Sequence, residues 1–283
     1  MLYSIEEMIE ILKIVNVSSI DDDYKMIDST RIEVIADCLE NSNYKMEYCG
    51  KLTFIYVHQN FDPSYPIILV SNHIDSLYNE HFMEKWNDEE LLGTFDNSIS
   101  NGVVLFSMLK EYLNPQVMVA FTANEESGMR GAKESILFFK EHDILKNLEM
   151  AIVMDITAEG YGEYEFTVEN YSVKKRKKDE NIIKFKNRKD FKKYAIKVFS
   201  PEQTLFIPVE SAAPDESWVY REYNVNCFTL CIPTAPHPDN DDSDIGYWMH
   251  SDRGLLTQFN SIPKYGESLE IFTNALAKQW RNL

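Results

Sequence analysis

Two adjacent acidic residues, Glu125 and Glu126, follow an apolar stretch at residues 117–121 and precede two glycines. An apolar run of this length that ends in a polar turn is typical of a buried strand. In an open α/β sheet, ligands bind outside the carboxyl ends of such strands. Two neighbouring carboxylates at that edge can serve two purposes, one binding a metal ion and the other activating a water molecule. The same acids could instead only cap the helix expected near Ala132, because acidic residues favour helix N-termini.

Other polar residues also follow apolar stretches, and they combine into a ligand set that suits a metal ion. Two imidazoles and three carboxylates are typical of zinc, and they also accept manganese or cobalt. A carboxylate that bridges two ions about 3.5–4 Å apart would make a two-metal hydrolytic site. A single histidine or acid after a strand more often stabilises the fold than binds a metal ion. The metal-site hypothesis therefore depends on all five residues occurring together. The candidate ligands are His73, Asp96, Glu126, Asp155 and His250, whereas His58, His81, His142 and His237 lack this context.

Hydrophobic periodicity predicts strands that alternate with helices. This alternation implies an α/β fold, a three-layer α/β/α sandwich around a mainly parallel mixed sheet. We expect a long loop at residues 78–92 and a meander of exposed strands within residues 160–200. The expected helices are 5–15, 29–39, 102–112, 132–142 and most of 255–278, and the expected strands are 44–48, 52–57, 66–70, 117–121, 151–154 and 226–232.

The chain of 283 residues, 44% of them hydrophobic, can bury a large core. No apolar run reaches the length of about 18 residues that a membrane span needs. The net charge of −18 argues against nucleic acid as a partner. The acid-rich stretch at residues 1–11 does not resemble a signal peptide, so we expect a cytoplasmic protein. The four cysteines are too few for a disulfide scaffold, and we interpret Cys227 and Cys231 as buried thiols.

A basic segment, Lys174 to Lys193, interrupts this acidic composition with 11 Lys and Arg against 3 acids. Such a segment could bind an anion or a partner. It is more typical of a solvated loop or an edge hairpin, because lysines protect exposed strand edges. We therefore expect a basic surface insertion at about residues 160–200.

Five short motifs occur in order along residues 73–251. They resemble the motifs of the co-catalytic zinc exopeptidases, the superfamily of aminopeptidases and related carboxypeptidases and deacylases. The spacing from Asp155 to His250 resembles the compact aminopeptidase branch, which lacks a large lid domain. The resemblance therefore implies one catalytic domain over residues 1–283. The motifs are His73-Ile74-Asp75, Gly93 to Asn97, Glu125 to Gly128, Asp155 and His250-Ser251.

The resemblance implies a role for each metal-binding residue. Asp96 would bridge two divalent metal ions, expected to be Zn²⁺. His73 and Asp155 would complete one metal site, and Glu126 and His250 would complete the other.

The resemblance also implies two catalytic residues that do not bind metal. Asp75 would hydrogen-bond the imidazole of His73 and fix its orientation. Glu125 would be the general base that takes a proton from the attacking water and passes it to the leaving amine.

Two features depart from the family pattern. The stretch from Asn97 to Gly102 lengthens the expected path from Asp96 to the following helix. Residues 211–218 only loosely match the substrate-side loop of the family, and we interpret Asp215 and Glu216 as surface acids.

The leading hypothesis is a two-zinc hydrolase that cleaves amide bonds, an aminopeptidase acting on short peptides. A carboxypeptidase or an N-acyl amino acid deacylase on the same scaffold is the alternative, and a non-catalytic binding homologue is a further one. We expect a small peptide or acylated amino acid as substrate, no nucleic acid or membrane partner, and no assignable oligomeric state.

Overall fold

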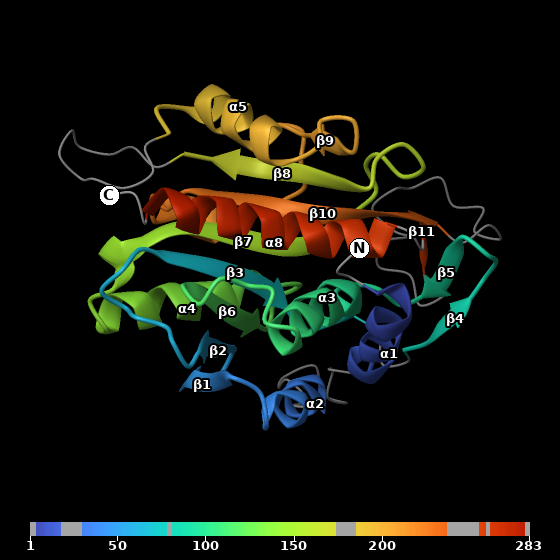
Figure 1. Cartoon of the computed structure of the whole chain (residues 1–283), viewed down its shortest axis with the longest axis horizontal. Helices are drawn as coiled ribbons and strands as arrows, with labels where there is room; N and C mark the ends of the chain where they lie inside the picture. The colour runs from blue at the N-terminus through green and yellow to red at the C-terminus, as the bar shows by residue number, and fades with distance from the viewer. Residues whose placement is uncertain are drawn as a thin grey trace.

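The computed structural model describes residues 4–17, 30–77, 81–173, 185–236, 255–258 and 261–280. Its central layer is a mixed β-sheet, which Figure 1 shows with β1 and β2 at the bottom and β8 and β9 at the top. The strands are β1 (Tyr44–Cys49), β2 (Thr53–His58), β3 (Ile67–His73), β4 (Met83–Lys85), β5 (Glu90–Gly93), β6 (Val117–Thr122), β7 (Leu148–Thr157), β8 (Phe166–Ser172), β9 (Thr204–Phe206), β10 (Cys227–Pro236) and β11 (Leu255–Gln258).

Four neighbouring strands in the middle of the sheet, in the order β6-β3-β7-β10, are parallel. On one side β2 pairs antiparallel with β6, and β1 pairs antiparallel with β2. On the other side β8 pairs antiparallel with β10, and β9 pairs parallel with β8. The last residues of β10 also pair with β11, which continues the sheet through β5 to β4. The expected parallel centre is therefore confirmed.

Helices cover both faces of this sheet. One face is covered by α1 (Ile5–Val15), α2 (Thr30–Leu39), α3 (Ser98–Leu109), α5 (Arg188–Val198) and α8 (Ser261–Trp280), and α8 crosses in front of β7 and β10 in Figure 1. The other face is covered by α4 (Arg130–Glu141) and α6 (Ser217–Glu222), and a short 3₁₀ helix, η1 (Leu145–Asn147), precedes β7.

The sequence of β3 explains why it lies between two helical layers. All of its residues are buried, and its alternate side chains point to opposite faces. Ile68 and Val70 pack into the core that contains α3, whereas Ile67 and Leu69 pack into the core that contains α4. A continuous apolar run is what a strand buried on both faces requires.

The structure corrects the expected loop at residues 78–92. Within its described part, β4 and β5 form an antiparallel pair that leads directly to Asp96. The helix after Asp96 was also placed too late, because α3 begins at Ser98 instead of residue 102. The path from Asp96 to its helix is therefore not lengthened. Residues 255–258 form a strand before the last helix begins.

The expected meander of exposed strands at residues 160–200 is also wrong. The strand β8 is almost completely buried, because it pairs with β10 on one side and β9 on the other. Within the range of the expected meander, residues 188–198 form the helix α5, whose N-cap Asn187 accepts a hydrogen bond from the backbone of Asp190 at 3.0 Å. Within the basic segment, residues 174–184 lie outside the described residues.

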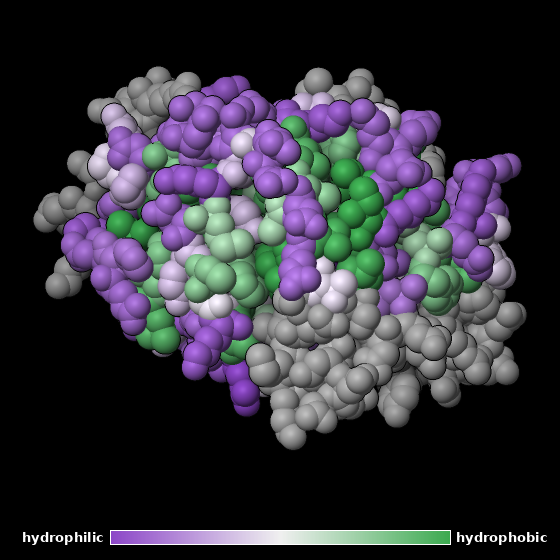
Figure 2. All heavy atoms as spheres, turned by 90° about the horizontal axis from the view of Figure 1, so that it is seen from below, coloured by the Kyte–Doolittle hydropathy of each residue, from purple (hydrophilic) through white to green (hydrophobic). Residues whose placement is uncertain are grey.

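Figure 2 shows the molecule from the end that carries β1, β2 and α2 in Figure 1. Hydrophobic residues gather near the middle of this face, and hydrophilic residues lie above them and on both sides in Figure 2. Among the described residues, no helix is long and apolar enough to cross a membrane. Cys227 and Cys231 are buried thiols, as expected.

Candidate metal centre

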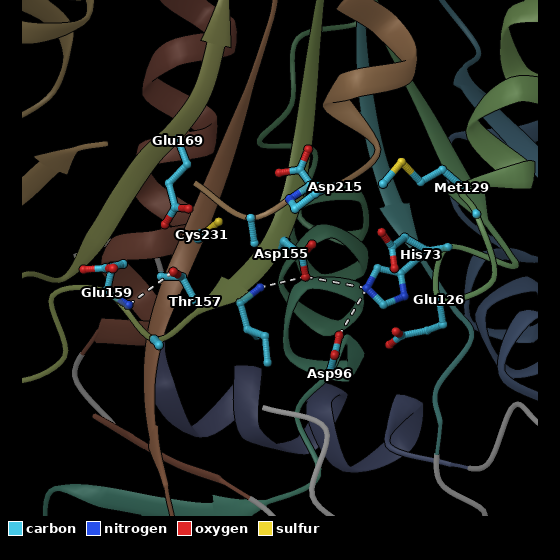
Figure 3. A pocket seen from close by; sticks show the side chains of 16 residues that line it. His73, Asp96, Glu126, Met129, Asp155, Thr157, Glu159, Glu169, Asp215 and Cys231 are labelled. Atoms are coloured by element: carbon cyan, nitrogen blue, oxygen red, sulfur yellow. Dashed lines mark hydrogen bonds and ion pairs between the residues drawn. The ribbon is translucent and has the colours of Figure 1, made fainter. Parts of the chain in front are cut away.

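His73 is the last residue of β3, and its imidazole lies beside Asp96 and Asp155 (Figure 3), with Asp75 near its other ring nitrogen. Its Nε2 atom lies 3.1 Å from Oδ1 of Asp96 and 3.5 Å from Oδ1 of Asp155. Its Nδ1 atom lies 3.5 Å from Oδ1 of Asp75 and 3.2 Å from the backbone oxygen of the same residue. The His73 side chain is 2% exposed. The imidazole is therefore buried and contacted by acids at both nitrogens.

Asp96 follows β5 and directly precedes Asn97, to which a cis peptide bond joins it. The Asn97 side chain donates to the backbone oxygen of Met154 in β7 at 2.8 Å. One turn into α3, the Asn101 side chain donates to the backbone oxygen of His73 at 2.8 Å. Two asparagines thus connect the start of α3 to β3 and β7, and this places Asp96 beside His73.

Asp155 lies within β7, which continues two residues beyond it. The expected strand at 151–154 was therefore too short. The backbone oxygen of Asp155 accepts a hydrogen bond from the hydroxyl of Tyr265 in α8 at 3.1 Å. The same hydroxyl also lies 3.0 Å from the backbone oxygen of Leu230 in β10, which is the alternative acceptor for its one proton. Tyr265 thereby contacts two neighbouring strands at the point where Asp155 projects.

Glu125 and Glu126 lie in the turn after β6, which ends at Thr122. Their backbone N–H groups donate to the two carboxylate oxygens of Asp75 at 3.2 and 3.3 Å. Gly131 follows this turn as the second residue of α4, and an added Cβ atom there would lie 2.5 Å from the backbone of Ala123. Only glycine fits this approach, so the tight turn depends on it.

The structure brings together two groups of potential metal ligands. The first is His73 with Asp96 and Asp155, and the second is His73 with Glu125 and Glu126. Within each group the ligand atoms lie within 4.8 Å of one another. His250, with its neighbours Tyr247, Trp248 and Ser251, lies outside the described residues, as does His237.

The charges of the cluster fit a bound cation. Burial raises the pKa of Glu125 to about 9, and the nearby negative charges of Asp155 and Glu216 add to this. Burial and the charge of Asp96 raise the pKa of Glu126 to about 10. Burial alone would lower the pKa of His73, but its carboxylate partners raise it well above its ordinary value. A divalent cation would relieve this repulsion, and the mixed imidazole and carboxylate donors are those that zinc binds.

Asp215 and Glu216, interpreted from the sequence as surface acids, are in fact buried. Asp215 accepts hydrogen bonds from Asn170 at 2.8 Å and from the hydroxyl of Thr229. Glu216 accepts from the hydroxyl of Ser71 at 2.8 Å. Burial raises the pKa of Glu216 to about 7. The turn-like sequence around Pro214 does not reveal this burial, because β3, β8 and β10 create it in the folded chain.

A cavity of about 510 Å³ opens beside the cluster. His73 and the cluster acids form one end, Glu159 and Glu169 lie on the other side, and Asp215 lies between the two (Figure 3). Burial raises the pKa of Glu169 to about 7, and the charges of Asp215 and Asp155 contribute to this. The described residues that line the cavity include neither lysine nor arginine. Sequence reasoning missed Glu169 because it lies within an ordinary strand sequence, with no motif around it.

The parallel sheet with helices on both faces, the acids at the strand ends and the cavity beside them define the chain as a co-catalytic zinc exopeptidase of the compact type. Residues 56–260 match Peptidase family M28, so the chain belongs to this family. The family is metal-dependent, and the chain is accordingly a metallohydrolase. No curated protein matches the chain in sequence.

Solved structures share the fold at low sequence identity. A TET aminopeptidase from a marine sediment archaeon of the Thaumarchaeota has a TM-score of 0.70 at 10% identity, with 98% of this chain and 99% of that chain covered. The aminopeptidase PepT from Bacillus cereus has a TM-score of 0.64 at 10% identity, with 96% and 99% covered. The LapA aminopeptidase from Legionella pneumophila has a TM-score of 0.57 at 13% identity, with 96% and 72% covered.

Proposed function

We propose that the chain is a two-zinc aminopeptidase that removes N-terminal residues from short peptides. The cavity beside the ligand cluster carries this proposal. Beyond the cluster, its lining contains Glu159, Glu169 and Asp215 and no described lysine or arginine. An acidic wall attracts the ammonium group of a peptide N-terminus. The same wall repels the carboxylate that a carboxypeptidase or an N-acyl amino acid deacylase must accept.

Five residues would hold the two ions in this proposal. His73 and Asp155 would bind one ion, Glu126 and His250 the other, and Asp96 would bridge them. Bound zinc ions acidify a water molecule and stabilise the negative charge that develops on a carbonyl oxygen. The role of His250 in this proposal is supported by the sequence motif, whereas the roles of the other four residues are also supported by their membership of the two groups of potential ligands.

Two side chains beside the ions would have separate roles, one in proton transfer and one in positioning. Glu125 accepts the proton of the attacking water and donates it to the leaving amine. Bound cations favour its ionised form, which is the form that can accept a proton. Asp75 holds the backbone of Glu125 and contacts the ring of His73. It thereby keeps the base and a ligand at a constant separation.

A substrate panel tests the proposal. The zinc-loaded full chain is assayed with alanyl, leucyl and lysyl anilides, with the same compounds N-acetylated, and with peptides blocked at the C-terminus. We expect turnover of the anilides with an unblocked amine and of the C-terminally blocked peptides, and loss of turnover on N-acetylation. Hydrolysis of acylated amino acids in preference to unblocked anilides would contradict the proposal and favour a deacylase.

A further inference from the structure

Arg31 in α2 is among the largest side chains that the structure buries completely. Its Nη1 atom donates to the backbone oxygen of Ile74 at 2.8 Å, and its Nη2 atom donates to the backbone oxygen of Val17 at 3.0 Å. A buried guanidinium costs free energy unless its surroundings compensate it. The surroundings of Arg31 must therefore offset the free-energy cost of burying its charge.

The cluster of carboxylates supplies that environment. Burial lowers the pKa of Arg31 to about 10, and the charges of Asp75 and Asp96 act in the opposite direction. The guanidinium therefore stays protonated at neutral pH. It places a permanent positive charge behind the acidic ligands, on the side from which α2 packs.

The hydrogen bond from Arg31 to Ile74 can fix the positions of the two neighbouring residues of the site, His73 and Asp75. Ile74 lies between His73 and Asp75, and its own N–H group donates to the backbone oxygen of Thr122 at 2.7 Å. The strand β6 thus holds one side of this peptide segment, and Arg31 holds the other. Because Asp75 in turn accepts from Glu125 and Glu126, a shift of the segment would move both groups of potential ligands.

Arg31 is itself held by a second set of contacts. Its Nη2 atom lies 3.5 Å from Nδ1 of His81, which lies 3.2 Å from Oδ1 of Asn16. The Asn16 side chain donates to the backbone oxygen of Phe82 at 2.8 Å. Arg31 and Asn16 both precede residue 56, where the match to the peptidase family begins. The N-terminal helices therefore contribute to the site from outside the matched region.

We propose that Arg31 is a positioning residue for the metal centre, which holds His73 and Asp75 in place through the backbone oxygen of Ile74. This inference rests on the proposed metal site. Replacing a group that hydrogen-bonds a metal ligand typically changes metal affinity by about 10–100-fold, and Arg31 acts on two such residues through the backbone of Ile74. Charge alone acts in the opposite direction, because a cation beside the site repels the bound ion. Loss of positioning would raise the zinc dissociation constant, whereas loss of the positive charge would lower it. The direction of the change therefore separates the two effects.

The experiment measures the dissociation constant for Zn²⁺ by competition with a chromophoric chelator, using the full chain. The variants are Arg31→Met, Arg31→Lys and, as a control, Arg188→Met, which changes an exposed arginine in α5. The Tm of each metal-free protein is measured in parallel. We expect the zinc dissociation constant of Arg31→Met to rise about 10–100-fold, and that of the control to stay unchanged. Arg31→Lys keeps the charge but not the fork that reaches both carbonyl oxygens, so its dissociation constant rises less.

A lower Tm for Arg31→Met with an unchanged or tighter zinc dissociation constant would overturn the inference, because it would assign Arg31 to stability or charge alone. If Arg31→Met does not fold, Arg31→Lys decides, and wild-type zinc affinity in that variant would overturn the inference. Failure of the wild-type chain to bind zinc would instead refute the proposed metal site, and the inference would fall with it.

Discussion

The carboxylate of Asp75 accepts a hydrogen bond from the backbone N–H group of Glu125 at 3.2 Å. Its other oxygen accepts from the N–H group of Glu126 at 3.3 Å. The same residue contacts Nδ1 of His73. One side chain therefore fixes the spacing between the ends of β3 and β6, two strands that are adjacent in the sheet but about 50 residues apart in sequence.

Replacing Asp75 tests whether this spacing matters. In Asp75→Asn, one oxygen becomes an amide nitrogen, which cannot accept the second backbone hydrogen bond. We expect zinc affinity and activity to fall by about 10–100-fold, as for other residues that support metal ligands. Chelator competition and anilide hydrolysis measure the two effects. Asp88→Asn, at an exposed carboxylate, is the control. Unchanged zinc affinity in Asp75→Asn would show that Asp75 does not position the ligands.

Glu125→Gln tests the role of the general base. Glutamine has nearly the shape of glutamate but cannot take a proton from water. General acid and base catalysis contributes about 10²–10⁴-fold in rate, so we expect kcat to fall by about that factor. Zinc stoichiometry, measured by atomic absorption, should not change. A variant that keeps wild-type kcat would remove Glu125 from the mechanism.

Glu169→Gln tests the acidic side of the cavity through its effect on stability. Burial raises the pKa of Glu169 to about 7, from the 4.5 expected of an unfolded glutamate. Between these values the folded protein binds more protons than the unfolded chain, so the free energy of unfolding decreases as the pH rises from about 4.5 to 7. Because glutamine does not titrate, the Glu169→Gln variant lacks this pH-dependent decrease in the free energy of unfolding.

We therefore expect the metal-free Glu169→Gln variant to match the wild type near pH 4.5. At pH 8 it should be more stable by up to about 3 kcal/mol, since one pKa unit corresponds to about 1.4 kcal/mol. Urea unfolding at several pH values measures the difference. A wild type that is the more stable protein at pH 8 would contradict the assigned pKa.

Gly131→Ala tests the tight turn that carries Glu125 and Glu126. The added methyl group would meet the backbone of Ala123 and Leu52 at 2.5 Å, and backbone cannot yield as a flexible side chain can. Overpacking of this kind costs about 1–3 kcal/mol, so we expect a lower Tm. Glu141→Ala, at the exposed end of α4, should change stability by less than about 0.5 kcal/mol. A Gly131→Ala variant with wild-type Tm would show that the turn can relax.

The sheet could be predicted from the sequence because its central strands are continuous apolar runs. Residues 67–70 and 117–121 have no polar interruption, and both are buried on two faces. The helix α5 was harder to predict, because Tyr194, Ile196 and Val198 alternate with other residues as they would in a strand. Its helical pattern is carried by Phe191 and Ala195, four residues apart, which are the buried positions. Packing against the core, rather than local alternation, decides the structure of this segment.

The candidate site could be predicted where residues follow strands in recognisable motifs. His73, Asp96, Glu126 and Asp155 have this property, and the structure places them together. Glu169 and Glu216 could not be found in this way. Their burial results from contacts with distant elements, such as the hydrogen bond from Ser71 to Glu216 across 145 residues of sequence. Arg31 was missed for the same reason, since its partner Ile74 lies 43 residues away.

The most direct test of the account is anomalous X-ray diffraction at the zinc absorption edge from crystals grown with Zn²⁺. We expect two anomalous peaks about 3.5–4 Å apart, with Asp96 between them, one beside His73 and Asp155 and the other beside Glu126. Crystals that bind zinc elsewhere, with no peak among these residues, would contradict the proposed metal centre.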